Sequence, residues 1–290
     1  AADSLLQVCH HLNGAEALPM AQPISGRGCG EPPPDLADVR ALGIGAPGVI
    51  DMQRGAVISA PNLGWSGVPL RDLLSNELGG MDVRVDNDVN AAALGECRYG
   101  AGRGATHAMG VWVGTGVGAG IVYGGEILHG TFGSGGEIGH TTLFPDMEGG
   151  DRVLERNASR HFMTGRIVER IESGEPSCLR DEAKGEDERV TADALREAWD
   201  AGDALVREEI TRGARYLGIA IANALSVVPM PVVILGGGLT ESMGEAYADL
   251  VRASIEEHLF PKEGRDPIDV RITELRENAG LLGACAIARG

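Results

Sequence analysis

The chain has 290 residues and 43% hydrophobic content, which is enough for one large or two modest domains with hydrophobic cores. Aromatic residues make up only 4%, whereas glycine occurs 44 times, so we expect an aliphatic interior and many tight turns. The formal net charge of −17 disfavours nucleic acid and anionic membranes as partners, because both require basic surfaces. It is compatible with a phosphorylated small molecule, since backbone N–H groups and a metal ion can bind phosphate.

Cysteine usage and hydropathy indicate a soluble, cytoplasmic protein. The five cysteines are scattered without a CxxC pair, which favours a reducing compartment, and no signal peptide opens the chain. The uncharged run 217–235 is about long enough to span a bilayer. Asn223 and the sequence Pro229-Met230-Pro231 divide that run, so we expect a buried helix followed by a buried strand. The cysteines are Cys9, Cys29, Cys97, Cys178 and Cys285.

The first third of the chain alternates strand and helix patterns, which predicts an α/β layer structure. The expected elements, in order, are a helix at 1–12, a loop at 26–34, a buried strand from Val39, a hairpin around Arg54-Gly55, a helix at 68–78, a strand at 81–85 and a helix at 89–99.

From residue 108 the pattern changes to strands followed by long helices. The expected elements are two strands joined by a glycine-rich turn at 109–128, helices at 152–173 and 191–228, a buried strand at 232–235, a helix at 242–258, a strand at 269–275 and a helix at 279–288. We therefore place a boundary near His107. It separates a small N-terminal lobe, residues 1–107, from a larger lobe, residues 108–278, with a cleft between them and residues 279–290 packing back onto the first lobe.

The segment GIGAPG, Gly43 to Gly48, matches the dinucleotide fingerprint G-x-G-x-x-G. That fingerprint must open a helix whose N-terminus faces the pyrophosphate. Here a hairpin pattern follows and Pro47 falls inside the loop, so we reject a dinucleotide site.

Two other glycine runs are candidates for binding a nucleotide. Gly114, Thr115, Gly116 and Gly118 lie between two strands, where backbone N–H groups and a hydroxyl can face an anion. Gly236, Gly237 and Gly238 follow a buried strand, where a flat ring such as adenine can approach the backbone. An ordinary hairpin turn and a flexible loop are the respective alternatives.

The stretch VDNDVNAAALGE, residues 85–96, ends a strand and begins a helix with three polar residues. Asp88 can act as a general base that accepts the proton of a hydroxyl as this oxygen attacks phosphorus. The alternative is a helix cap, for which Asn87, Asp88 and Asn90 all qualify.

Further polar residues fall on glycine-rich or helix-start positions. Glu137 and His140 in GGEIGH can both hydrogen-bond sugar hydroxyls, although a lone histidine is more often structural or merely exposed. Glu155 would ordinarily be a first-turn acid that is favoured by the helix dipole.

The order of these motifs resembles the ROK family of bacterial sugar kinases and related repressors. The resemblance runs from about Ala41 to the C-terminus, and it implies the actin-like (hexokinase-type) ATPase fold, in which two α/β lobes close on sugar and ATP. The motifs that carry it are PNLGW, VDNDVNAAALGE, GTGVGAGIVYGGEILHG, GGEIGH, LERNAS and ILGGGL.

The resemblance also implies roles for individual residues. Asp88 matches the catalytic base that deprotonates the sugar, and Thr115 with its flanking glycines matches a phosphate loop. Residues 236–238 match the adenosine loop. Residues that match sugar-contacting positions or lie near them are Asn62, Asn87, Glu137, His140 and Glu155.

The chain departs from the family pattern twice. The usual N-terminal D-x-G-G-T-[KN] hairpin, which grips the nucleotide phosphates, has no counterpart before Ala41. Either the chain is a truncated version of a longer protein or this grip has been lost. The family's zinc-binding cysteines are also missing from PDMEGGDRVLE, where Val153 stands in place of the last one. Because a structural zinc site generally needs four ligands, we predict no zinc and assign His140 to sugar contact alone.

We therefore expect an ATP- and Mg²⁺-dependent hexose kinase of glucokinase type that acts on a hexose or N-acetylhexosamine. The resemblance further implies a homodimer. The alternative is a catalytically impaired, sugar-binding or regulatory member of the family, motivated by the missing phosphate hairpin. A dehydrogenase built on GIGAPG is a distant third.

Overall fold

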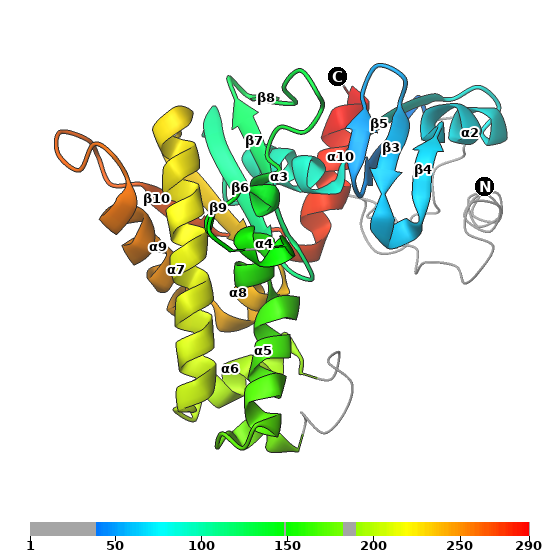
Figure 1. The fold of residues 1–290 in the computed structure, drawn as a ribbon. Helices are drawn as coiled ribbons and strands as arrows, with labels where there is room; N and C mark the ends of the chain where they lie inside the picture. The colour runs from blue at the N-terminus through cyan, green and yellow to red at the C-terminus, as the bar shows by residue number, and fades with distance from the viewer. Residues whose placement is uncertain (1–38, 148, 182–189, 290) are drawn as a thin grey trace, which may run out of the picture.

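The structure is a computed structural model that describes residues 39–147, 149–181 and 190–289 (Figure 1). The helix expected at 1–12, the loop expected at 26–34, and both Cys9 and Cys29 lie outside the described residues.

Two small sheets form the N-terminal part of the fold. Strands β1 (Ala41–Ala46) and β5 (Asp82–Asn87) pair in parallel, so that their carboxyl ends lie together. Strands β2 (Val49–Asp51), β3 (Ala56–Ala60) and β4 (Trp65–Val68) form an antiparallel sheet, which confirms the predicted hairpin. Helix α2 (Leu70–Glu77) begins later than predicted, because Val68 pairs with Val57 in the sheet.

A five-stranded sheet forms the centre of the second lobe, in the order β10-β9-β6-β7-β8. Strands β6 and β7 are antiparallel around the glycine-rich turn, as predicted, while β9 and β10 run parallel to β6. The strand bounds are β6 His107–Val113, β7 Val117–Tyr123, β8 Glu126–Ile127, β9 Val232–Gly236 and β10 Asp269–Ile272. Strand β6 begins where we place the lobe boundary, but that division stays a prediction.

The long helices predicted for this lobe are each divided in two. Ser159 ends α4 and caps α5, because its hydroxyl accepts a hydrogen bond from the N–H of Phe162. Asp203 caps α7 in the same way, and Gly244, with φ of +59°, separates α8 from α9. The helix bounds are α3 Asp88–Tyr99, α4 Glu155–Ala158, α5 Arg160–Glu172, α6 Ala192–Asp200, α7 Ala204–Val227, α8 Gly238–Met243, α9 Glu245–His258 and α10 Ala279–Arg289.

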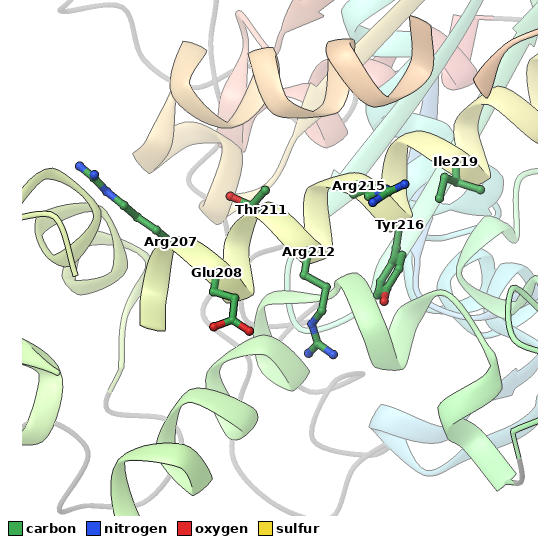
Figure 2. A pocket seen from close by; sticks show the side chains of 7 residues that line it. All are labelled: Arg207, Glu208, Thr211, Arg212, Arg215, Tyr216 and Ile219. Carbon is green, nitrogen blue, oxygen red and sulfur yellow. The ribbon is translucent and has the colours of Figure 1, made fainter. Parts of the chain in front are cut away.

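Helix α7 packs with α9 beside the central sheet and supplies much of the hydrophobic core (Figure 1). The uncharged run 217–235 is the second half of α7 followed by the buried strand β9, as predicted. None of the described helices is both long and apolar enough to cross a membrane. Residues of α7 also line a surface hollow of about 570 Å³, among them Arg207, Arg212 and Tyr216 (Figure 2).

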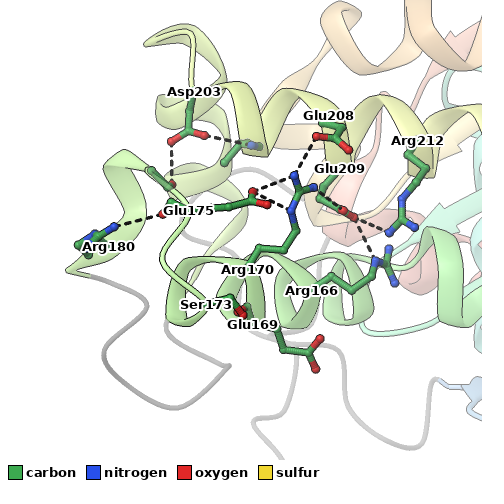
Figure 3. A network of polar contacts seen from close by, with 12 residues as sticks. Arg166, Glu169, Arg170, Ser173, Glu175, Arg180, Asp203, Glu208, Glu209 and Arg212 are labelled. Atoms are coloured by element: carbon green, nitrogen blue, oxygen red, sulfur yellow. Dashed lines mark hydrogen bonds and ion pairs between the residues drawn. The ribbon is translucent and has the colours of Figure 1, made fainter.

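Helices α5 and α7 are joined by a network of ion pairs centred on Glu209 (Figure 3). This side chain is only 5% exposed and accepts hydrogen bonds from Arg166 at 3.0 Å, Arg170 at 3.1 Å and Arg212 at 2.6 Å. Burial alone raises the pKa of Glu209, but the hydrogen bonds from Arg166 and Arg212 outweigh it and bring the pKa below its ordinary value. The charge is therefore retained and fixes α5 against α7.

Helix α10 packs against both α3 and β1, beside α3 in Figure 1, and small residues allow this close approach. A Cβ atom on Gly283 would overlap the carbonyl oxygen of Ala91 in α3, and one on Gly43 in β1 would overlap that of Ala284. Gly95 in α3 meets the carbonyl of Ala279 in the same manner. We call this contact the glycine seam. Only residues without a side chain fit it, because protein interiors are close-packed.

Candidate functional site

The junction between β5 and α3 is fixed by the side chain of Asn87. Its Oδ1 accepts hydrogen bonds from the N–H groups of Val89 at 2.9 Å and Asn90 at 3.1 Å, which is the geometry of a helix cap. Its Nδ2 donates to the carbonyl of Gly48 at 3.1 Å, just beyond the end of β1. Asn87 therefore binds the ends of both parallel strands to the start of α3.

Asp88 is the first residue of α3, and its carboxylate opens into a cavity of about 780 Å³. Oδ1 accepts a hydrogen bond from the N–H of Val89 at 2.9 Å, and the N–H of Asp88 itself also hydrogen-bonds the carboxylate. The side chain stays accessible to water, yet the surrounding protein desolvates it and raises its pKa, an effect that its backbone hydrogen bonds only partly offset. A carboxylate in such a position can accept a proton.

Both lobes contribute to the walls of this cavity. Residues 47–49 and 59–62 come from the first lobe, and the turn between β6 and β7 comes from the second. The cavity brings together most of the site residues predicted from the sequence, namely Asn62, Asn87, Asp88, Gly114, Gly116, Gly118, Glu137, His140 and Glu155.

Glu137 and His140 approach the cavity from the loop that follows β8. Their side chains are 3.8 Å apart, and that of His140 is 73% exposed. Burial raises the pKa of Glu137; His140 opposes this rise, while Glu155 and Asp88 add to it. Three carboxylates thus face one cavity, which suits a ligand rich in hydroxyl groups.

Glu155 connects helix α4 to the glycine-rich turn. Its Oε2 accepts a hydrogen bond from the N–H of Val117 at 3.0 Å, and a side chain on Gly116 would clash with this carboxylate. The Gly114 carbonyl accepts a bond from the N–H of Arg160, at the start of α5, at 3.0 Å. The turn is therefore held by the segment that carries LERNAS. Thr115, at its tip, is exposed and does not line the cavity.

The triglycine segment lies beside the cavity rather than in its wall. Gly236 ends β9 next to Trp112, whose indole leaves no room for a Cβ at this position and itself lines the cavity. Gly237, with φ of +88°, packs against the backbone of Val113, and Gly238 begins α8. Gly236, Gly237 and Gly238 do not line the cavity that Asp88 lines, and their part in nucleotide binding stays a prediction.

The GIGAPG segment leads from β1 directly into β2 with no helix between them, in agreement with our rejection of a dinucleotide site. The end of the segment nevertheless lies in the cavity wall, which Pro47 and Gly48 line. In the segment where the family carries zinc ligands, Val153 pairs with Thr142 in an antiparallel bridge. Among the residues described, no group of three or more His, Cys, Asp or Glu side chains is arranged to hold a metal ion.

Sequence reasoning missed several residues of the site. Trp112, Ser59 and Ser134 line the cavity, and His129, which does not line it, hydrogen-bonds Asp86 near the end of β5. Asp86, an acid near the end of the apolar strand β5, was a weak signal that a partner is present, because a charged side chain buried in an apolar strand requires one. Nothing in the sequence indicated that this partner would be His129.

Comparison with known proteins finds similarity to sugar kinases and to repressors. The sequence profile of the ROK family matches residues 33–290. A glucokinase from Halalkalibacterium halodurans is 37% identical over 256 residues, which cover 85% of this chain and 75% of that protein. The chain belongs to the ROK family.

Its relatives in the ROK family include both enzymes and regulators. A putative xylose repressor from a Caldicellulosiruptor species is 34% identical, covering 88% of this chain and 64% of that protein. Among solved structures, a ROK family glucokinase from Streptomyces griseus, in complex with glucose and AMPPNP, has a TM-score of 0.76 at 33% identity and covers 87% of this chain and 82% of that one. The fold is thus the actin-like ATPase fold predicted from the motif order, with a cleft between two α/β lobes.

Proposed function

We propose that the chain is an ATP-dependent hexose kinase of glucokinase type, with Asp88 as the general base. The observation that carries this proposal is the position of the Asp88 carboxylate, which opens into a cavity shared with the β6–β7 glycine turn and with Glu137, His140 and Glu155. The similarity to glucokinases, one of them solved with glucose and AMPPNP, supports the same reaction class.

In this mechanism the sugar lies between Asp88 and the acids of the second lobe. Asp88 accepts the proton of the attacking hydroxyl as this oxygen bonds the γ-phosphorus of ATP, and the bond from that phosphorus to the β-phosphate oxygen breaks, so that ADP leaves. Asn62, Glu137, His140 and Glu155 hydrogen-bond the remaining hydroxyls and orient the ring. Asn87 contributes by holding the junction, because its amide already bonds Gly48 and the first turn of α3.

We assign the β6–β7 turn to a phosphate group of the nucleotide. A Cβ on Gly114 would meet no atom within 4 Å, so there is open space beside this residue of the turn, and Thr115, the residue that follows, is exposed. Backbone N–H groups in such a turn can donate to phosphate oxygens. Magnesium would accompany the nucleotide, where it neutralises charge that develops on the phosphates.

A second function is a sugar-binding regulator without catalysis, which the similarity to the putative xylose repressor favours. Coupled ADP release with a panel of hexoses and N-acetylhexosamines separates the two, with sugar binding measured in parallel by calorimetry. ADP release that depends on one of the sugars supports the kinase. Sugar binding without ADP release at any nucleotide concentration contradicts the kinase and supports the regulator.

A further inference from the structure

The segment from Leu128 to Glu137 follows β8 and connects the two lobes. On the second lobe, the N–H of Leu128 donates to Ile121 at 2.8 Å, and the carbonyl of Gly136 accepts from Ala119 at 3.1 Å. On the first lobe, Gly133 approaches the carbonyl of Ile50 in β2 so closely that a Cβ atom would lie 2.6 Å from it. We call this segment, residues 128–137, the bridging loop.

A single side chain of the bridging loop, His129, is hydrogen-bonded to the β5–α3 junction. Its Nε2 lies 2.7 Å from Oδ2 of Asp86, two residues before the proposed base. The same loop is closed on itself, because the N–H of Gly135 donates to the His129 carbonyl at 2.9 Å. A displacement of His129 would therefore be transmitted to the part of the loop that lines the cavity.

Asp86 is a firm anchor for this contact. It is only 2% exposed, and its Oδ1 accepts bonds from the N–H of Asn87 at 2.7 Å and from the side-chain amide of Asn90 at 3.0 Å. A buried carboxylate is costly unless it is paired and hydrogen-bonded. His129 supplies that pairing, and the bond to Asp86 raises the pKa of the imidazole, which favours its charged form.

We propose that His129 is a positioning residue for the sugar: through Asp86 it sets the distance between the bridging loop, which carries Ser134 and Glu137, and the junction that carries Asp88. Ser134 and Glu137 on the loop and Asp88 at the junction all line the cavity, whereas His129 itself does not. The inference rests on the proposed function for its link to sugar, but the contact itself is tested separately below.

The kinetic test compares His129→Ala with His129→Gln, using glucose as the probe sugar. Gln can still donate a hydrogen bond to Asp86, whereas Ala cannot. We expect His129→Ala to raise the KM for glucose at least tenfold while kcat changes less than threefold, and His129→Gln to restore most of the affinity. His161→Ala, which removes an exposed histidine of α5 outside the cavity, is the matched control and should leave both constants unchanged. A glucose KM for His129→Ala within twofold of the unmodified chain overturns the proposal.

Hydrogen exchange tests the contact without any turnover. In the sugar-free protein, His129→Ala should speed amide exchange in the peptide 130–137 at least tenfold, while exchange in β9 stays unchanged and shows that the fold is intact. If the unmodified chain releases no ADP, the kinase proposal fails, and the exchange result still decides the role of His129. Equal exchange of peptide 130–137 in both proteins overturns the inference whatever the activity.

Discussion

Asn87 caps helix α3 and shares one of the first N–H groups of that helix with Asp88. The Asn87 side-chain oxygen accepts hydrogen bonds from the N–H groups of Val89 and Asn90, whereas the Asp88 carboxylate is hydrogen-bonded by the N–H groups of Val89 and of Asp88 itself. The helix-cap alternative for this motif thus applies to Asn87. Asp88 makes no hydrogen bond to Asn90 and lines the cavity.

Replacement of Asp88 by Asn should abolish most turnover and preserve sugar binding. The amide cannot accept a proton from the attacking hydroxyl, and general bases typically contribute about 10²- to 10⁴-fold to rate. We expect kcat to fall by about that factor, with the sugar Kd changed by less than about fivefold. Steady-state ADP release and calorimetry provide the two measurements. Asp72→Asn, an exposed acid of α2, serves as control. Turnover near that of the unmodified chain would falsify the mechanism.

The pH profile of the reaction should report the environment of Asp88. The base must be ionised to act, so kcat/KM should rise with pH through its pKa. Burial raises that pKa above the ordinary value of 3.8, and the acid limb should therefore lie at higher pH than for a solvated aspartate. Glu137→Gln is the control, because burial also raises the pKa of the Glu137 carboxyl. The acid limb should persist in this variant if Asp88 is the titrating group. If the acid limb disappears in Glu137→Gln, the titrating group is Glu137, and the assignment to Asp88 is wrong.

The glycine seam should tolerate no methyl group. We expect Gly283→Ala to lower the free energy of unfolding by about 1–3 kcal/mol, because the new Cβ would overlap the Ala91 carbonyl and force α10 away from α3. Gly280→Ala, in the same helix with no atom within 4 Å of the new Cβ, should be neutral or slightly stabilising. Urea denaturation of the two variants gives the comparison, and equal stabilities would show that the seam can relax.

Glu209 should contribute far more to stability than its neighbour Glu208. Glu209→Gln leaves three arginines without their buried partner, and breaking such a pair costs about 3 kcal/mol or more. Glu208→Gln removes only an exposed bond to Arg170, worth about 0–1 kcal/mol.

The effect of Glu209 should also depend on pH, with a defined sign. Its pKa is lowered in the folded state, so its stabilisation is present above the unfolded pKa and is lost as pH falls through the folded value. The difference in unfolding free energy between the unmodified chain and Glu209→Gln should therefore shrink in acid. Chemical denaturation at pH 7 and at pH 3 checks this, and a difference that grows in acid would contradict the assigned network.

The sequence predicts the β5–α3 junction well because its signals are local. An apolar strand that ends in polar residues and an alanine-rich helix is specified by adjacent positions, and so is the turn that begins at Gly114. The sequence predicts the long helices without their breaks at Ser159 and Gly244. The apolar residues on either side of each break keep a helical spacing, so the break is visible only from the capping geometry. The bond from His129 to Asp86 spans 43 positions and depends on sheet order, which no local pattern encodes.

The placement of α10 ties one end of the described chain to the other. Strand β1 begins at Ala41, but the helix that covers it starts at Ala279, so the contact closes a loop of more than two hundred residues. Long-range contacts of this kind slow folding. During synthesis on the ribosome, β1 emerges long before α10, so its residues lack this cover until α10 has been made.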